Sequence, residues 1–98
     1  MKRKELLALL KAHSEKQVKV HIKDGPTAFP TFVDNNFMNR SDINIDTENK
    51  PLSTNEICKE LEDVQKAVPI YFWMSDIDLL KITNYEVTDT LDFFVQPI

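Results

Sequence analysis

Two short runs of the sequence carry side chains that could bind a charged or aromatic ligand together. Lys19, His21 and Lys23 alternate with apolar residues, and Tyr71 and Trp73 do the same later in the chain. Successive side chains of a β-strand point to opposite faces. If both runs are strands of one sheet, these five residues share one face. Such a face could stack bases and pair phosphates, or anchor a partner protein through its aromatic rings.

Three interpretations of Tyr71 and Trp73 stay open. The Phe-rich segment Ala28–Met38 could fold over the face and bury both rings, the face could bind a protein, or it could bind nucleic acid. The net charge of −4 disfavours nucleic acid, because attraction to phosphates dominates such affinities. The charge is also uneven: residues 1–40 carry eight Lys/Arg against four Asp/Glu, and residues 41–98 carry four against twelve. An acidic half could meet a basic partner, or inhibit by mimicking nucleic acid.

The remaining candidate chemistry is weaker. Alternate residues from 42 to 48 resemble the start of a calcium loop, but Thr47 and Ser53 replace the required glycine and glutamate. We therefore expect a solvated acidic loop there. His13 and His21 have no zinc-site spacing to each other or to the lone Cys58. Cys58 borders the apolar stripe of a predicted helix, which is typical of a packed, unreactive cysteine. The sequence predicts no catalytic residue, no metal and no cofactor, and we expect a protein that is not an enzyme. The alternate residues that resemble the start of a calcium loop are Asp42, Asn44, Asp46 and Glu48.

Composition fits one domain covering residues 1–98. The single glycine, Gly25, excludes a glycine-rich phosphate loop. The longest apolar run, residues 67–74, is too short to span a membrane. The N-terminal apolar run is too short for an export signal. With one cysteine and no such signal, we expect a cytoplasmic protein.

The elements that would position these side chains repeat along the chain. Residues 4–24 and 55–76 each read as an amphipathic helix followed by an alternating strand. Helix positions correspond at an offset of 51, as Leu6 does to Ile57, and strand positions at 52, as Val20 does to Phe72. The repeat predicts an α+β fold built from two similar helix–strand units. In it, two helices pack on one face of a mostly antiparallel sheet of four to six strands.

The predicted boundaries follow from periodicity and turn chemistry. One helix covers residues 2–14, and the other begins at Ser53, which forms a capping box with Glu56. In the strand over residues 79–87 the apolar residues change from even to odd positions, which predicts a β-bulge near Thr83 and Asn84. The last three strands are expected to form an antiparallel meander. The predicted strands cover residues 17–23, 28–33, 43–45, 70–74, 79–87 and 91–96.

The second half carries a resemblance. Its helix is followed by VPIYF, an acidic turn, LLKITNYEV and FFV, a pattern that resembles small uncharacterised helix–strand–strand–strand proteins of phages and prophages. The resemblance covers residues 52–98 and implies an accessory protein with no catalytic residue. We therefore expect a small non-enzymatic protein that binds another protein or itself, with single-stranded nucleic acid binding or acidic mimicry as alternatives.

Overall fold

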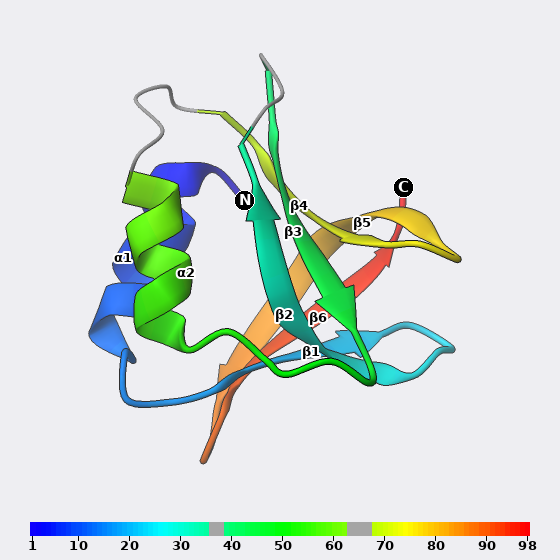
Figure 1. The fold of residues 1–98 in the computed structure, drawn as a ribbon. Helices are drawn as coiled ribbons and strands as arrows, with labels where there is room; N and C mark the ends of the chain where they lie inside the picture. The colour runs from blue at the N-terminus through cyan, green and yellow to red at the C-terminus, as the bar shows by residue number, and fades with distance from the viewer. Residues whose placement is uncertain (36–38, 63–67) are drawn as a thin grey trace.

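A computed structural model describes residues 1–35, 39–62 and 68–98, and shows six strands closed into one barrel with two helices beside it (Figure 1). Strands adjacent in the chain pair antiparallel, except that β3 pairs with β4 in parallel; β6 closes the barrel in parallel with β1. The elements in chain order are α1 (Arg3–Ala12), β1 (Val18–Ile22), β2 (Thr27–Asp34), β3 (Ser41–Asp46), α2 (Thr54–Glu62), β4 (Ile70–Met74), β5 (Asp78–Val87) and β6 (Leu91–Pro97).

The predicted fold class is wrong. The sequence predicts two helices on one face of a mostly antiparallel sheet, whereas the strands form a closed mixed barrel. Closure comes from the pairing of β1 with β6, at opposite ends of the chain. Hydrophobic periodicity reports which residues face a core but not which distant strand lies alongside. The helices pack against each other, and α2 also contacts β2.

The internal repeat is larger than the sequence indicated. Each half is a helix followed by three strands, and the strand registers of the two halves coincide. Adding 52 to positions in β1 and β2, and 50 to those in β3, converts every pairing of the first half into one of the second. Thus Val20 pairs with Ala28 as Phe72 does with Leu80. The closing pairs are also equivalent, since Ile43 faces Phe72 in the same register in which Phe93 faces Val20.

The two halves also share a β-bulge. The register shifts between Pro30 and Phe32 in β2, and between Ile82 and Asn84 in β5. The extra residue is a threonine each time. Thr31 Oγ1 donates to the Asn44 carbonyl at 3.4 Å, and Thr83 Oγ1 donates to the Phe94 carbonyl at 3.0 Å. The predicted bulge is thus confirmed in β5, and it has an unpredicted counterpart in β2.

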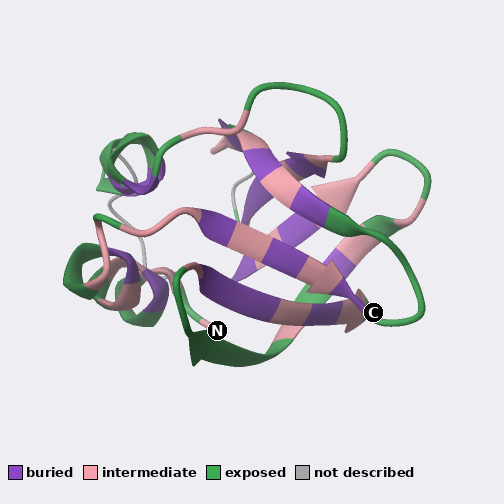
Figure 2. Ribbon diagram, turned by 90° about the horizontal axis from the view of Figure 1, so that it is seen from below, coloured by how far each residue is buried: buried purple, intermediate pink, exposed green. Residues whose placement is uncertain are grey.

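The core lies between the helices and inside the barrel. Buried and partly exposed residues alternate along most strands, as Figure 2 shows. One row of inward residues crosses four neighbouring strands. Val33 pairs with Ile43, Ile43 with Phe72, and Phe72 with Leu80. All four are buried. The residues on either side of them in each strand therefore point outward, and that outer surface carries the candidate sites.

Both predicted helices are confirmed, although α1 covers Arg3–Ala12 instead of the predicted residues 2–14. Glu56 N–H donates to Ser53 Oγ at 3.1 Å, and Ser53 N–H donates to Glu56 Oε1 at 3.0 Å, which is the expected capping box. The apolar stripe is buried in both helices, at Leu6, Leu10, Ile57 and Leu61. By contrast, Lys2 at the equivalent cap of α1 makes no side-chain cap hydrogen bond.

Candidate functional site

The structure places the five predicted interaction residues on two opposite parts of the barrel. Lys19 and His21 lie on β1 and Lys23 directly follows it, whereas Tyr71 and Trp73 lie on β4. In the order β1-β2-β3-β4-β5-β6, two strands separate β1 from β4 in either direction. The barrel therefore does not bring the two groups of residues together. Two outer sites therefore have to be described separately.

At the first site, on β1 and β6, His21 lies against a buried aspartate. His21 Nε2 is 3.2 Å from Asp92 Oδ1. Thr90 Oγ1 donates to the same oxygen at 2.7 Å, and Thr88 Oγ1 donates to Oδ2 at 3.0 Å. The ring of His21 stacks on Phe94, with centroids 4.9 Å apart and planes 18° apart. Sequence reasoning missed this cluster, because its partners are far apart in the chain and the β1–β6 pairing joins them.

The cluster stabilises the ionised form of Asp92. Burial acts to raise the pKa of this carboxyl, but hydrogen bonds from Thr90, His21 and Thr88 outweigh it and hold the pKa below its usual value. The carboxylate thus has three side-chain donors. These contacts orient His21, and the three donors stabilise the negative charge of Asp92 without any bound ligand.

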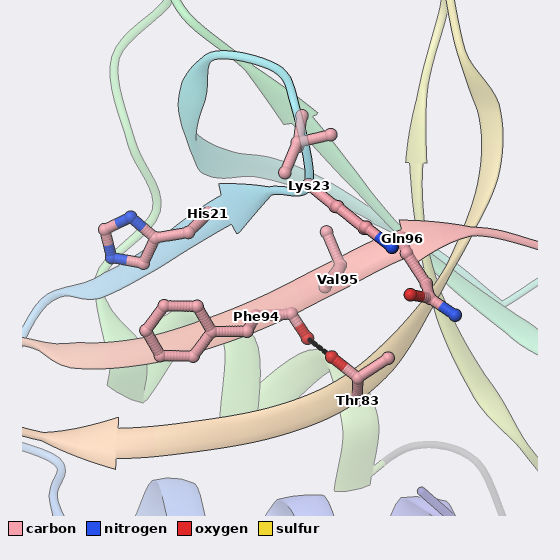
Figure 3. A pocket seen from close by; sticks show the side chains of 7 residues that line it. His21, Lys23, Thr83, Phe94, Val95 and Gln96 are labelled. Atoms are coloured by element: carbon pink, nitrogen blue, oxygen red, sulfur yellow. Dashed lines mark hydrogen bonds between the residues drawn. The ribbon is translucent and has the colours of Figure 1, made fainter.

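A hollow of about 250 Å³ adjoins His21 and Phe94 (Figure 3). Lys23 and Gln96 extend along one side of it, and the hydrogen bond from Thr83 to the Phe94 carbonyl crosses its lower side. Ligand pockets in proteins are commonly ~300–1,000 Å³, so this hollow is small. It offers a cation and an amide beside an aromatic stack, which suits one phosphate or base edge.

The second site is an outward row across β2, β3, β4 and β5. Phe32 pairs with Asn44, Asn44 with Trp73, and Trp73 with Leu79, so these four lie side by side across the barrel. Phe32 is 54 % exposed, and the other three are partly exposed. Neighbouring strands are ~4.8 Å apart, which places Phe32 and Trp73 about 10 Å from each other. Two aromatic rings thus flank Asn44 on one surface, which we call the aromatic row.

The interpretation in which the Phe-rich segment buries Tyr71 and Trp73 is not what the described residues show. Residues 27–34 form β2, which lies two strands away from β4 with β3 between them. Phe32 therefore stands beside Trp73 instead of over it. Both Tyr71 and Trp73 stay partly exposed. Residues 36–38 of that segment lie outside the described part of the chain.

In the acidic run beside this row, the short strand predicted at 43–45 is confirmed, but the expected solvated loop is wrong from Asp42 to Asp46. Residues 41–46 form β3, and Asp42 is only 3 % exposed although it lies on the outer surface beside Tyr71. Arg40 Nε is 3.2 Å from Asp42 Oδ1. Burial raises the pKa of Asp42; Arg40 opposes this, and the carboxylates of Asp34 and Asp78 add to the rise.

Trp73 and the aspartates enclose a second hollow. The indole N–H of Trp73 donates to Asp78 Oδ1 at 3.0 Å, which fixes the orientation of the ring. Asp78 adopts a left-handed backbone with φ 75°, which Asp tolerates better than most residues. A hollow of about 210 Å³ is lined by Asp34, Arg40, Asp42, Asn44 and Trp73. Its walls thus combine two carboxylates, a guanidinium, an amide and an indole.

The remaining candidates do not form a site. Cys58 is buried in α2, and burial raises the pKa of its thiol, as for a packed residue. His13 ends α1 as its C-cap. Within residues 1–35, 39–62 and 68–98, no group of three His, Cys, Asp or Glu could hold a metal ion.

Comparison with known proteins assigns no family. No protein-family model matches the chain, and neither does a curated protein or a solved structure. The resemblance of residues 52–98 to small phage proteins therefore stays a prediction. None of the helices in the described residues is long and apolar enough to cross a membrane.

Proposed function

We propose that this chain is a small non-enzymatic binding protein of the cytoplasm that acts through contacts with another protein, with self-association as the simplest case. The observation that carries the proposal is the aromatic row, in which Phe32 and Trp73 flank Asn44 on the outer surface. Large aromatic side chains are enriched among the residues that anchor protein interfaces.

Burial and pairing distinguish this row from ordinary surface residues. The adjacent inward row fills the core, so Phe32 is not needed there and leaves more than half of its side chain in water. Tyr71 is one step along the same surface, next to Asp42. Aromatic rings at the centre with Asp34 and Asp78 at the edge give the apolar core and polar rim that interfaces commonly have.

The test compares oligomeric state with and without the row. Size-exclusion chromatography with light scattering is measured on the wild type from low to high micromolar concentration, and then on Phe32→Ser. We expect a concentration-dependent dimer that Phe32→Ser weakens at least tenfold. Tyr85→Ser, which removes a ring 44 % exposed on β5, is the matched control and should dimerise like the wild type. A wild type that stays monomeric at high micromolar concentration removes self-association.

A second candidate function, binding of single-stranded nucleic acid, has its own observation on β1 and β6. The stacked His21 and Phe94 rings lie between Lys19 and Lys23, beside the hollow of Figure 3. Nucleic-acid grooves combine such cations with aromatic platforms. Asp92 and Glu86 lie on the same surface and oppose phosphate binding.

Trp73 cannot report that binding, because β4 is opposite β1 in the barrel. The measurement is therefore fluorescence anisotropy of a labelled oligonucleotide at low salt. If the candidate is right, affinity falls steeply as salt rises, and Lys19→Glu/Lys23→Glu abolishes it. An oligonucleotide that shows no anisotropy change at low salt rules this function out.

A further inference from the structure

The far end of β5 has an edge that no strand covers. β4 pairs with β5 only from Asp78 to Leu80, whereas β6 pairs with it as far as Val87. Within residues 1–35, 39–62 and 68–98, no second strand lies along β5 from Lys81 to Val87. The turn that joins β5 to β6 is the lowest part of the ribbon in Figure 1. An uncovered strand edge presents unpaired backbone groups and can pair with another chain.

The contacts of β6 with β1 show which backbone groups reach this open edge. Leu91 N–H donates to the Gln17 carbonyl at 2.9 Å. The Val95 carbonyl accepts from Lys23 N–H, also at 2.9 Å. Alternate residues of β6, beginning at Leu91, therefore turn their backbone groups toward β1, and their direct partners on β5 turn N–H and C=O away from β6. These partners are Ile82, Tyr85 and Val87.

The equivalent edge of β2 is occupied within the chain. Pro30, which corresponds to Ile82 in the repeat, has no N–H, and its carbonyl accepts from Leu52 N–H at 2.8 Å. Val33 corresponds to Tyr85, but Val33 is buried and Tyr85 is exposed. A proline and a covering segment are two ways in which proteins block strand edges. In the described part of the chain, the edge of β5 has neither.

Two apolar side chains on the inward face of this edge lack cover. Tyr85 pairs with Phe93, which is buried. Val87 pairs with Leu91, which is buried as well. Tyr85 and Val87 are themselves exposed, and Figure 2 shows this end of β5 in green beside the buried residues of β6. A strand added to β5 would place alternate side chains against them.

The outer face of the edge carries one charge of each sign, at Lys81 and Glu86. Neither forms an ion pair with a described residue. Because Thr83 is the extra residue of the bulge, Lys81 and Glu86 share one face, and Ile82 and Tyr85 share the other. A complementary antiparallel strand has a basic residue opposite Glu86, an acidic residue opposite Lys81 and apolar residues opposite the other two.

We propose that the open edge of β5 binds an extended segment of a partner protein as an added antiparallel strand. From its N-terminus, the segment carries a basic residue, an apolar, a polar and a second apolar residue, and then an acidic residue. Backbone hydrogen bonds supply the affinity, and the alternating side chains supply the specificity. The edge lies beyond Leu80 and outside the aromatic row, so this proposal does not depend on the self-association proposed above.

The test titrates the full ¹⁵N-labelled chain with the peptide acetyl-TKVNVET-amide, whose central asparagine would lie opposite Asn84. We expect saturable shifts of the amide resonances of Ile82, Tyr85 and Val87 at millimolar peptide. Methylation of both valine nitrogens removes donors that face β5 and should abolish the shifts. Methylation of the asparagine nitrogen, which faces away from β5, should leave the affinity within about twofold. No saturable shift with the unmodified peptide, or equal binding of the two methylated peptides, overturns the proposal.

Variants of exposed residues locate the peptide. Lys81→Glu/Glu86→Lys should weaken acetyl-TKVNVET-amide about tenfold, because it makes both cross-strand charge pairs repulsive. The same variant should recover binding with acetyl-TEVNVKT-amide, in which the two charges are exchanged. Phe32→Ser, in the aromatic row, is the matched control and should bind the peptide as the wild type does. Wild-type affinity of the folded charge-reversed variant for acetyl-TKVNVET-amide overturns the proposal.

This result can be separated from the proposed function. A wild type that stays monomeric and binds the peptide removes self-association and keeps the edge site. A dimer that Phe32→Ser disrupts, in a protein that does not bind the peptide, keeps the aromatic row and removes the edge site. Tyr85→Ser has the opposite expectation to Phe32→Ser, since it should weaken the peptide and leave the dimer unchanged.

Discussion

Asp42 and Asp92 face the outside of the barrel at positions related by its internal repeat, but their carboxyls are perturbed in opposite directions. Hydrogen bonds lower the pKa of Asp92 against the effect of burial, while burial raises the pKa of Asp42. The repeated backbone therefore places two identical side chains in different surroundings. Asp92 accepts hydrogen bonds from Thr88 and Thr90 and lies beside His21, whereas Asp42 is ion-paired with Arg40.

Asp92 should stabilise the fold at neutral pH and lose this contribution in acid. Its pKa is lower in the folded than in the unfolded chain, so its contribution is present above the unfolded value of 3.8 and falls as pH drops through the folded value. We expect Asp92→Asn to cost about 1.5–3 kcal/mol at pH 7. Urea unfolding at pH 7 and pH 3 measures it, and an undiminished cost at pH 3 contradicts the assignment.

Asp42 should show the opposite dependence. Its pKa is raised in the folded state, so its contribution is greatest below the unfolded value of 3.8 and is lost as pH rises through the folded value. The free energy of unfolding of Asp42→Asn relative to wild type should therefore increase between pH 3 and pH 7. The same urea series reads it, with Asp89→Asn as the control for a carboxylate on the surface. A relative stability that falls with pH would refute a carboxyl whose burial outweighs its ion pair with Arg40.

The uncapped start of α1 offers a stabilising substitution. Lys2 stands where Ser53 caps α2, and Glu5 stands where Glu56 completes the capping box. Lys2→Ser should supply the missing side-chain cap hydrogen bond and remove a positive charge from the helix N-terminus, gaining about 1 kcal/mol. Ser53→Ala should lose a similar amount. Thermal unfolding compares the two variants, and an unchanged or lower melting temperature for Lys2→Ser contradicts the helix equivalence.

Two valines measure how differently β2 and the end of β5 are covered. Val33 in β2 is 5 % exposed, whereas Val87 in β5 is 42 % exposed. Substitution by threonine keeps the shape and adds a hydroxyl, so Val33→Thr buries an unpaired polar group and should cost about 1–3 kcal/mol. Val87→Thr should change stability by less than about 0.5 kcal/mol. If both substitutions lower the free energy of unfolding in urea equally, the end of β5 at Val87 is as well buried as β2 at Val33.

Trp73 should respond to the sign of a quencher's charge. The ring is partly exposed and is surrounded by Asp34, Asp42 and Asp78, with Arg40 as the nearby cation. Caesium ions should therefore quench its emission more than iodide does, relative to free tryptophan, and the difference should shrink in high salt. Stronger quenching by iodide would mean that Arg40 dominates the electrostatic potential around the ring.

The sequence predicted those features that depend on neighbouring residues. The capping box at Ser53, the bulge at Thr83 and the alternation in Ile70–Met74 all follow from side chains within a few positions of one another. The offset of 52 between Val20 and Phe72 also proved to be a true structural equivalence. The acidic run at Asp42 was misjudged because an isolated polar run resembles a loop until its strand partners are known.

The sequence by itself determined the two helix–strand units, their buried faces and the residues that each strand turns outward. These depend on periodicity and capping, which act over a few residues. Only the tertiary structure decided that β1 joins β6 and β4 joins β3. That closure separates Lys19, His21 and Lys23 from Trp73, and it brings His21 to Asp92 and Trp73 to the Asp42 hollow. The physical reason is that parallel strand pairing joins segments distant in the chain, and no local pattern encodes which segments meet.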